Sequence, residues 1–350
     1  MNEKVTIIGG GHQGLAMAAH LTKHGVKCYL WNRTVENIKD IVKDKEIICK
    51  GIYEETLKIE CASGNIQDVL QKTIMVTTPS TAHKDVAAML AKYVDDSFCI
   101  ILNPGRTFGA VEFIRTLKEN GCTKLPIVAE TQTIAYTCRR EKKNIVYIYA
   151  LKKGIPIATY KSADVHRVFD YMPECLSEAF IPVNSYYQTS LSNIGMILHC
   201  APVLMNIGWI ENDKVDFKYY YEGISPSVAA FLEKMDNERI EVAHKMGITV
   251  LSVKEWLQHT YSTEGENLYE HLRSNIFYKD IDAPLSIHHR YIEEDVPNGL
   301  VPIEALGKQL GVSTLNISLI IDLANAVMNT NYRKNGRNIQ HLLKEEDKKW

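Results

Sequence analysis

The chain has 350 residues, of which 45% are hydrophobic and 23% are charged, a composition typical of a globular protein with room for two domains. The formal net charge of −2 gives no electrostatic reason to expect nucleic acid or an anionic membrane as a partner. The eight cysteines form no CxxC pair, and no cluster of His, Cys and carboxylate residues has ligand spacing. The sequence therefore predicts neither a metal site nor a redox motif.

The cysteines and the apolar segments also bear on location. Several cysteines lie in apolar runs, which is typical of reduced thiols in a cytoplasmic protein. The apolar run near the N-terminus is too short for a signal peptide. The most apolar stretch, Ile194–Ile210, is short and contains His, Pro and Asn, so we expect no membrane segment.

The first predicted elements surround a glycine-rich turn. Val5–Ile8 is a β-branched run typical of a strand, Leu15–Lys23 has helical periodicity, and GGGHQG (9–14) joins them. GxGxxG between a strand and a helix predicts a turn that holds a pyrophosphate, because unpaired N–H groups at a helix N-terminus favour negative charge. A glycine-rich turn of some other α/β domain is the alternative. The candidate cofactor-binding residues here are Gly9, Gly11, His12, Gln13 and Gly14, although His12 could equally face the solvent.

The second predicted strand, Lys27–Trp31, ends in Asn32, Arg33 and Thr34. An acidic residue at this position would bind the ribose hydroxyls of NAD, and none is present. Asn, Arg and Thr can instead hold a 2′-phosphate, with the guanidinium of Arg33 supplying a planar fork of donors. The sequence therefore predicts that NADP(H) is preferred over NAD(H).

Strands and helices continue to alternate up to about residue 185, which predicts a parallel, doubly wound (Rossmann) sheet in a dinucleotide-binding domain over residues 1–185. The strand Thr73–Thr77 runs into Thr78 and Pro79, a loop placed to line the cofactor crevice. Glu130 is a further candidate cofactor contact, with packing behind the site as the alternative. The other predicted helices and strands are Ala82–Tyr93, Phe98–Leu102, Gly109–Gly121, Leu125–Ala129, Val146–Ala150 and Ile155–Ala158.

After Tyr186 the strand signals fade, and residues 186–350 are predicted to form an all-helical substrate and catalytic domain. Ser225 and Pro226 make a good N-cap and first-turn pair for a helix that runs to about Met246. Further helices are predicted over Val253–Thr260, Pro302–Leu310 and Leu315–Asn329.

The stretch Ser192–Trp209 is apolar almost throughout and contains His199. Asn206 lies seven residues further on, which returns to nearly the same helix face. Pro202 has no N–H to donate, so it leaves the carbonyl of Leu198 without its helical partner. Two polar side chains and a freed carbonyl suggest a wall that faces a ligand. The alternative is a core helix with one hydrogen-bonded histidine.

A polar, ionisable stretch, HHRYIEED (288–295), precedes the last predicted helices. Taken alone, this run of charge favours a solvated loop.

Several long segments together resemble the opine dehydrogenases, and the resemblance extends from the glycine-rich turn to about Leu343. The segments that carry it are ILNPGRTFGAVEF (101–113), AETQTIAYTCR (129–139), NIGMILHCAPVLMN (193–206), YYYEGISPSVAAFLEKMDNERI (219–240) and HHRYIEEDVPNGLVP (288–302). The resemblance implies a Rossmann domain joined to an all-helical domain. It also implies NAD(P)H-dependent reductive condensation of an amino group with a 2-oxo acid, commonly pyruvate, through an imine.

The same resemblance implies roles for particular residues. His199 and Asp295 match the catalytic pair of the family, and Arg290 falls at the position of the arginine that binds a substrate carboxylate. Asn206 and Tyr221 are weaker candidates for substrate contacts. The norvaline-type bacterial members carry an acidic residue where this chain has Asn32 and Arg33. This difference affects which cofactor is expected, and not which reaction. A homodimer is expected on the same grounds.

Two other functions share parts of this pattern. Ketopantoate and 3-hydroxyacid-type reductases have a similar domain plan, but they use a lysine on the helical domain, and the stretch around His199 contains none. A non-catalytic NADP-binding sensor would need neither His199 nor Asp295.

Overall fold

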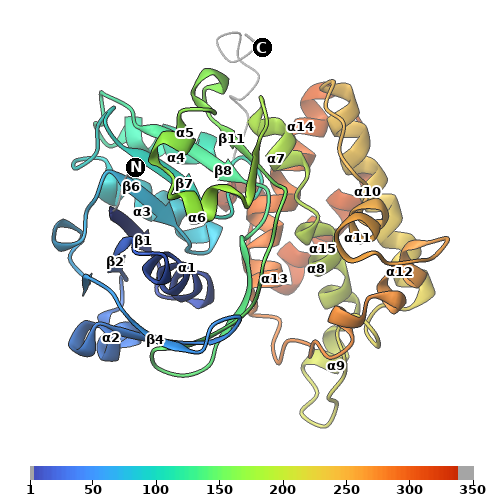
Figure 1. The fold of residues 1–350 in the computed structure, drawn as a ribbon. Coiled ribbons are helices and arrows are strands. Elements are labelled where there is room, and N and C mark those ends of the chain that lie inside the picture. Colours follow the sequence, from blue (N-terminus) through green and yellow to red (C-terminus); the bar gives the residue numbers. More distant parts are fainter. Residues whose placement is uncertain (1–3, 338–350) are drawn as a thin grey trace. The chain divides into compact units, whose positions relative to one another are not determined.

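The computed structural model of the chain describes residues 4–337. It divides into two compact units, of which the first ends at Ser190 and the second begins at Leu191 (Figure 1). The sequence pattern placed this division at residue 185.

The N-terminal unit is built on an eight-stranded sheet with the strand order β12-β11-β8-β7-β6-β1-β2-β5. Within it, β5-β2-β1-β6-β7-β8 follows the order of a dinucleotide-binding sheet, and these strands are all parallel. The doubly wound prediction is therefore confirmed, with β11 added antiparallel to β8. The strands are β1 (Lys4–Ile8), β2 (Lys27–Trp31), β5 (Cys61–Ser63), β6 (Thr73–Val76), β7 (Cys99–Leu102), β8 (Ile127–Thr131), β11 (Ile155–Thr159) and β12 (Phe180–Pro182).

A second sheet, which the sequence analysis did not predict, has four strands in the order β4-β3-β10-β9. Its strands are β3 (Glu46–Gly51), β4 (Glu55–Lys58), β9 (Tyr136–Arg140) and β10 (Ile145–Leu151). The strand expected over Val146–Ala150 was assigned to the main sheet, and this was wrong, because it pairs with β3 and β9 instead. Over residues 145–148 of this strand, the buried residues Val146 and Ile148 alternate with half-buried ones, as in a sheet that is covered on one face.

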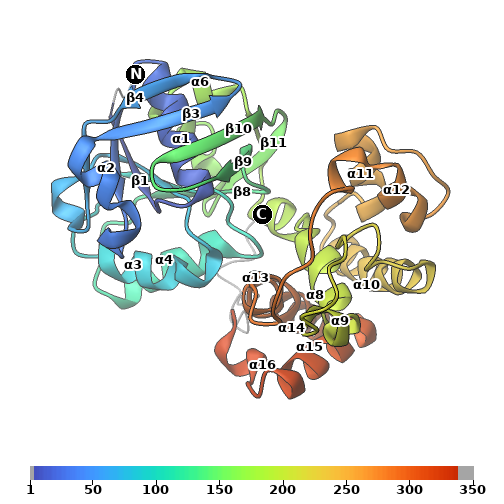
Figure 2. The same ribbon diagram turned by 90° about the horizontal axis from the view of Figure 1, so that it is seen from below.

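Helix α1 (His12–Lys23) lies between the two sheets, where it contacts β1 and β2 on one side and β3, β9 and β10 on the other. This layering is visible in Figure 2, with α3 (His83–Leu90) and α4 (Gly109–Glu119) on the opposite side of the main sheet. Successive residues of a strand point to opposite faces, so Ile7 packs in the α1 layer and Ile8 in the layer of α3 and α4. The shorter helices of this part are α2 (Lys39–Asp44), α5 (Val168–Tyr171), α6 (Glu174–Ser177) and α7 (Tyr186–Leu191).

The C-terminal unit is helical. Its central helix α8 (Gly195–Met205) is almost wholly apolar and packs against α10, α13 and α15. No strand forms within residues 191–337, where one isolated bridge joins Lys218 to Asp282. The other helices are α9 (Ile207–Ile210), α10 (Pro226–Lys245), α11 (Val253–Tyr261), α12 (Leu268–Ser274), α13 (Arg290–Glu293), a π-helical turn (Val296–Leu300), α14 (Val301–Leu310), α15 (Leu315–Val327) and α16 (Tyr332–Asn335).

The start of α10 shows how closely the local sequence sets a helix boundary. The hydroxyl of Ser225 accepts a hydrogen bond from the backbone N–H of Val228, and Pro226 occupies the first turn, where its missing N–H costs nothing. The predicted start of this helix is confirmed, and the helix ends at Lys245.

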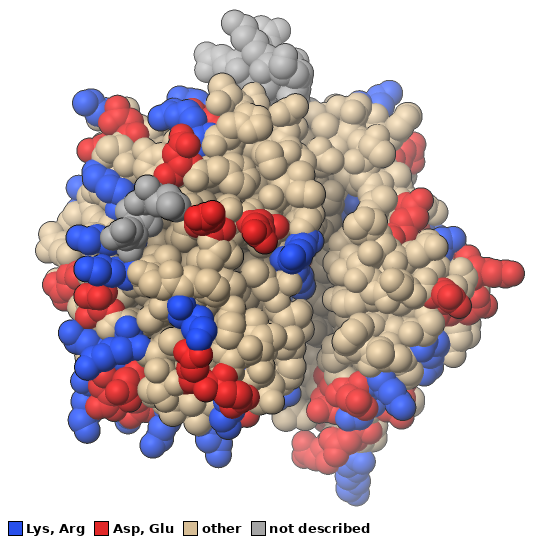
Figure 3. Space-filling view, viewed as in Figure 1, with Lys and Arg blue, Asp and Glu red and all other residues tan. Residues whose placement is uncertain are grey.

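Within residues 4–337, no helix combines the length and the apolar character that a bilayer crossing requires. On the face drawn in Figure 3, basic and acidic side chains are interspersed. All eight cysteines are free thiols.

Candidate active site

The glycine-rich turn lies between the end of β1 and the start of α1. Gly9 has φ +111°, a conformation that side chains rarely adopt, and a Cβ on Gly14 would lie 1.7 Å from the carbonyl oxygen of Gly9. A Cβ on Gly11 would meet no protein atom within 4 Å. Gly9 and Gly14 are therefore required by the fold, whereas the absence of a side chain at Gly11 keeps open the space where a pyrophosphate would approach the helix N-terminus.

His12 and Gln13 point toward the second sheet. The Nδ1 atom of His12 accepts a hydrogen bond from the backbone N–H of Arg140 at 2.9 Å. The side-chain amide of Gln13 donates to the carbonyl of Tyr136 at 2.9 Å and to Sγ of Cys138 at 3.1 Å. These hydrogen bonds tie the glycine-rich turn to β9.

Arg140 is a residue that the sequence analysis missed. Its guanidinium donates to the carbonyl of Gly10 at 2.7 Å and to the carbonyl of Asn37 at 2.6 Å. It thereby links the glycine-rich turn to the segment that follows β2. In the sequence it belongs to the charged run RREKK (139–143), and no local pattern distinguishes it from the other basic residues there.

A cavity of about 370 Å³ opens beside the ends of β2 and β6. It is lined by Trp31, Asn32, Arg33, Thr34, Asn37, Thr78, Pro79, Ala82, Asp85, Val86 and Met89. Five candidate cofactor residues from two segments far apart in the sequence thus share one cavity. Its place beside the first half of the sheet is where the adenosine half of a dinucleotide binds in this fold.

The polar groups of the cavity differ in how they are engaged. Asn32 accepts a hydrogen bond from the N–H of Gly10 at 2.9 Å and donates to the carbonyl of Thr34 at 2.8 Å. The guanidinium of Arg33 lies 3.4 Å from the carboxylate of Asp85, and both side chains are more than 70% exposed. A surface pair of this kind contributes little, so Arg33 can exchange its partner for a ligand anion.

Thr78 provides an independent test of whether this cavity fits a cofactor. Its hydroxyl oxygen is buried and has no hydrogen-bond partner among residues 4–337. Buried hydroxyl groups are normally paired, so this one suits a ligand that brings a donor or acceptor. With the open approach at Gly11 and the exposed guanidinium of Arg33, the residues present fit a nicotinamide dinucleotide.

The carboxylate of Glu130 is hydrogen-bonded within the protein. It is completely buried; Oε2 accepts a hydrogen bond from the N–H of Ala110 at 2.8 Å, and Oε1 accepts from the hydroxyls of Thr189 and Ser190 at 2.6 Å. A carboxylate at the first turn of α4 is favoured by the helix dipole. Since three protein donors already use this carboxylate, the geometry favours packing behind the site over cofactor contact.

In the helical unit, Pro202 leaves a carbonyl in α8 without its helical donor, as expected. The hydroxyl of Tyr219 occupies this gap, 3.3 Å from the carbonyl oxygen of Leu198 and 2.7 Å from that of His199. Burial raises the pKa of Tyr219 well above its ordinary value, so the phenol keeps its proton and can donate. The carbonyl freed by Pro202 therefore has a donor within the protein, in place of the ligand-facing role expected for it.

The side chains of His199 and Asp295 are in contact within the helical unit. Nδ1 of His199 lies 2.7 Å from Oδ2 of Asp295, which confirms the hydrogen bond expected between them. The Asp295 side chain is 1% exposed, and that of His199 is 14% exposed. The solvated-loop alternative is wrong for this end of the 288–295 stretch. Because Asp295 uses Nδ1, Nε2 is the ring nitrogen that can exchange a proton with a ligand.

Tyr291 stacks on His199, with ring centroids 3.8 Å apart and planes 14° from parallel. His289 packs edge-on against the same tyrosine. Burial, followed by the charges of Arg290 and His199, lowers the pKa of His289. His199 is thus held by a carboxylate at its edge and a ring on its face. Tyr291 belongs to the polar stretch HHRYIEED (288–295), and no role was expected for it from the sequence.

The three candidate substrate residues differ in their environment. Arg290 is half-exposed and lies 3.1 Å from the buried carboxylate of Glu294. Asn206 donates to the carbonyls of Pro202 and Gly223, both at 2.8 Å, and the hydroxyl of Tyr221 donates to the carbonyl of Arg273 at 2.6 Å. Asn206 and Tyr221 therefore brace the backbone, whereas Arg290 keeps part of its guanidinium accessible.

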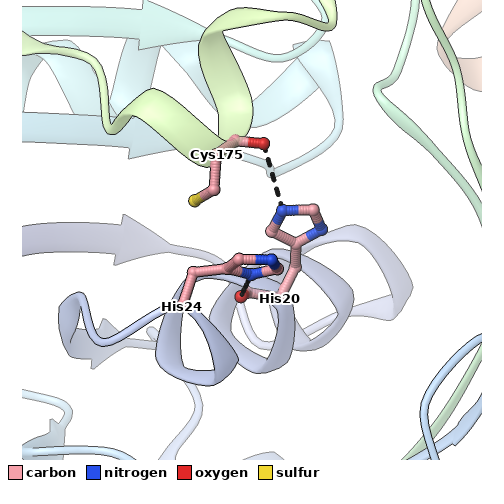
Figure 4. A group of neighbouring side chains, drawn as sticks. All are labelled: His20, His24 and Cys175. Atoms are coloured by element: carbon pink, nitrogen blue, oxygen red, sulfur yellow. Dashed lines mark hydrogen bonds between the residues drawn. The ribbon is translucent and has the colours of Figure 1, made fainter.

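One cluster of possible metal ligands lies away from both sites. His20, His24 and Cys175 converge from α1 and α6, with their ligand atoms within 4.8 Å of one another (Figure 4). Nε2 of His20 is 3.2 Å from the carbonyl oxygen of Cys175, and Nδ1 of His24 is 2.8 Å from that of His20. Burial, followed by the proximity of His24, lowers the pKa of His20 to about 4. These hydrogen bonds give the cluster a packing role that joins α6 to α1.

The sequence matches two family profiles. Residues 4–116 match the N-terminus of NAD-dependent glycerol-3-phosphate dehydrogenase, and residues 182–328 match the alpha-helical domain of NAD/NADP octopine/nopaline dehydrogenase. Fold and profiles together define an NAD(P)-dependent oxidoreductase. An opine dehydrogenase from Arthrobacter sp. (strain 1C) is 33% identical over 339 residues, which cover 96% of this chain and 94% of that protein. The chain belongs to the opine dehydrogenase family.

Solved structures agree with this assignment at the level of the fold. Octopine dehydrogenase with NADH and L-arginine has a TM-score of 0.76 and 17% identity, covering 93% of this chain and 89% of that one. Yersinopine dehydrogenase with NADP⁺ bound has a TM-score of 0.79 and 12% identity, covering 99% and 97%.

Proposed function

We propose that this opine dehydrogenase joins the amino group of an L-amino acid to a 2-oxo acid such as pyruvate and reduces the resulting imine with NADPH. The observation that carries the proposal is the hydrogen bond between His199 and Asp295 in the helical unit. Condensation of the amine and the ketone releases water and forms the C=N bond. Hydride and a proton then convert this bond to a secondary amine, which leaves NADP⁺ and an N-(carboxyalkyl) amino acid.

The proton transfers need a group that titrates near neutrality, and an imidazole is that group. His199 can take a proton from the substrate ammonium, which frees the neutral amine to attack the ketone, and it donates a proton as hydroxide departs from the carbinolamine. Asp295 accepts the Nδ1–H, which sets the tautomer and stabilises the imidazolium form. The bound dinucleotide supplies the hydride. Arg290 holds a substrate carboxylate with its accessible N–H groups, which orients the reacting carbon.

Steady-state oxidation of NADPH with pyruvate and a panel of L-amino acids tests this function, with mass spectrometry of the product. Turnover that requires both substrates and yields the condensed secondary amine supports the proposal. Turnover with the oxo acid alone would indicate a simple reductase of the ketopantoate or 3-hydroxyacid type. NADPH binding without turnover of any pair would indicate a sensor.

The proposed preference for NADP(H) over NAD(H) rests on Arg33 and on the lack of an acidic residue at the end of β2. The side chain of Asn32 is already hydrogen-bonded to the backbone of Gly10 and Thr34. Arg33 is therefore the residue that would bind a 2′-phosphate. We expect Arg33→Asp to raise the Kd for NADPH by about tenfold or more, since a charge-assisted hydrogen bond contributes about 1.5–3 kcal/mol, and to leave NADH binding nearly unchanged.

Asp85→Asn provides the matched variant for this prediction, because it removes the carboxylate that pairs with Arg33. We expect it to strengthen NADPH binding modestly. Fluorescence titration of each variant with both cofactors measures these changes. Equal losses for NADPH and NADH in Arg33→Asp would contradict the proposed preference.

We also propose that the protein forms a homodimer through α15. Four aliphatic side chains spaced four residues apart, Leu315, Leu319, Leu323 and Val327, are each at least 37% exposed along one face of this helix. A continuous apolar stripe of this kind is typical of an interface, and a twofold axis would pair it with itself. We expect Leu319→Glu to convert a dimer to a monomer in light scattering coupled to size exclusion, and Lys308→Glu, at an exposed ammonium on α14, to have no such effect.

The eight free thiols support a further proposal, that the protein works in the reducing cytoplasm.

A further inference from the structure

Arg140 is the last residue of β9, where the chain enters the turn that leads to β10. Its Nε donates to the carbonyl of Lys143 at 2.8 Å, and Nη2 donates to the same carbonyl. The turn is closed by backbone hydrogen bonds from Glu141 to Ile145 and from Ile145 to Lys142. β10, which follows, pairs with both β3 and β9. The guanidinium of Arg140 is therefore fixed to a well-paired part of the second sheet.

The same guanidinium also reaches two segments that border the candidate cofactor site. Nη1 donates to the carbonyl of Gly10 at 2.7 Å, and Nη2 donates to the carbonyl of Asn37 at 2.6 Å. Gly10 belongs to the glycine-rich turn, and Asn37 lines the cavity beside β2 and β6. A Cβ on Gly10 would collide with the side chain of Ile38, so the two segments are in close contact. Arg140 thus joins them to the second sheet at the point where they touch.

The hydrogen bond to Gly10 orients the peptide group between Gly10 and Gly11. This group is planar and trans, so its C=O and N–H bonds point in opposite directions. Because Arg140 holds the C=O, the N–H of Gly11 is directed to the other side. Two glycines leave such a group free to rotate, since neither has a Cβ that restricts its backbone. The preceding peptide group is held separately, because the N–H of Gly10 donates to Asn32 at 2.9 Å.

We propose that Arg140 is a positioning residue for the dinucleotide, which holds the Gly10–Gly11 peptide group so that the N–H of Gly11 faces the pyrophosphate. Gly11 is the N-cap of α1, and N–H groups at the start of a helix bind phosphate when they point at it. A charged donor on the C=O also polarises the peptide group, which makes its N–H a stronger donor. The pyrophosphate is common to NADH and NADPH, so this role is independent of the proposed substrates and of the proposed preference between the two cofactors.

Titration of the full-length protein with ligands that do or do not carry a pyrophosphate tests this role. We expect Arg140→Met to raise the Kd for NADPH, NADH and ADP-ribose by the same factor, about tenfold, because the hydrogen bond from Gly11 to the pyrophosphate is weakened. The Kd for adenosine, which has no phosphate, should stay within threefold when measured by ligand-observed NMR. Equal losses for adenosine and NADPH would indicate a general loss of site structure and would overturn the proposal, as would unchanged values for all four ligands.

Two further variants separate orientation of the turn from simple attraction of the phosphates by positive charge. Arg139→Met is the matched control, because Arg139 is the adjacent arginine and is exposed, and its Kd values should stay within twofold of the wild type. Arg140→Lys keeps the charge but lacks the planar fork that reaches three carbonyls. We expect it to bind NADPH at least fivefold more weakly than the wild type, and it carries the same test if Arg140→Met does not fold. Full recovery of binding by the lysine would assign the effect to charge and contradict the positioning role.

Hydrogen exchange of the protein without cofactor reports on the turn directly. We expect the amides of residues 9–14 to exchange at least fivefold faster in Arg140→Met than in the wild type, as measured by peptide mass spectrometry. The amides of β1 should exchange at the same rate in both proteins. A turn whose exchange does not change on loss of the guanidinium is not held by Arg140, and this result would overturn the proposal even if no substrate pair turns over.

Discussion

Replacing His199 by asparagine is expected to lower kcat by about 10²–10⁴-fold, the range that general acid–base catalysis supplies. The imidazole is the group that exchanges protons with the substrate, and the amide of asparagine does not titrate. The Kd for NADPH should stay within twofold, because the dinucleotide-binding residues belong to the other unit. Steady-state kinetics at saturating substrates and fluorescence titration measure the two quantities.

Asp295→Asn should also lower kcat strongly, because an amide at this position favours the wrong histidine tautomer, a change that costs about 10⁴-fold in the serine-protease triad. His244→Gln is a suitable control, since His244 is an exposed histidine near the end of α10. A kcat for His199→Asn within threefold of the wild type would contradict the proposed role of His199 as the proton carrier.

Arg239→Met is expected to destabilise the helical unit by about 3–5 kcal/mol, the usual cost of removing one partner of a buried ion pair. Arg239 is completely buried on α10, and its Nε donates to Asp236 at 2.8 Å. The same guanidinium donates to the carbonyls of Leu191 and Leu251. The substitution therefore removes the charged partner of a buried carboxylate, which keeps the N–H of Val253, and leaves two carbonyls without this donor. Urea denaturation followed by far-UV circular dichroism measures the loss.

Lys234→Met on the same helix is the matched control, because Lys234 is exposed. Its effect should lie within about 0.5 kcal/mol, as for most surface substitutions. If Arg239→Met unfolded at the same urea concentration as the control, the hydrogen bonds of the guanidinium would not contribute to stability.

The parts of the fold that the sequence predicted well have a local cause. The apolar run before GGGHQG, the Ser225–Pro226 pair and the helix end expected near Met246 each depend on a few neighbouring residues, and the elements they predict are present in the structure. The second sheet has no such local cause. β3 and β10 are about a hundred residues apart in the chain and pair as parallel strands. The pattern of Val146–Ala150 therefore does not indicate which of the two sheets this strand joins.

The site residues show the same distinction. The pairing of His199 with Asp295 was expected from the family resemblance, since periodicity does not bring together residues 96 positions apart. The orientation of polar side chains could not be inferred from the residues themselves. His12, Gln13 and Asn32 occupy positions typical of cofactor contacts, yet their side chains are engaged by β9 and by the backbone of the turn. The hydroxyl of Tyr219 lies at the carbonyl that Pro202 leaves without a helical donor, and no pattern in the sequence places Tyr219 beside α8.

The attachment of the glycine-rich turn to β9 determines at which stage the turn loses its conformational entropy. Holding the backbone of one residue in a single conformation costs about 1–2 kcal/mol at 25 °C. Protein hydrogen bonds hold Gly10, His12 and Gln13, so this entropy is lost as the N-terminal unit folds and not when a dinucleotide arrives. The pyrophosphate thus meets a preorganised receptor, and more of its interaction energy is expressed as affinity.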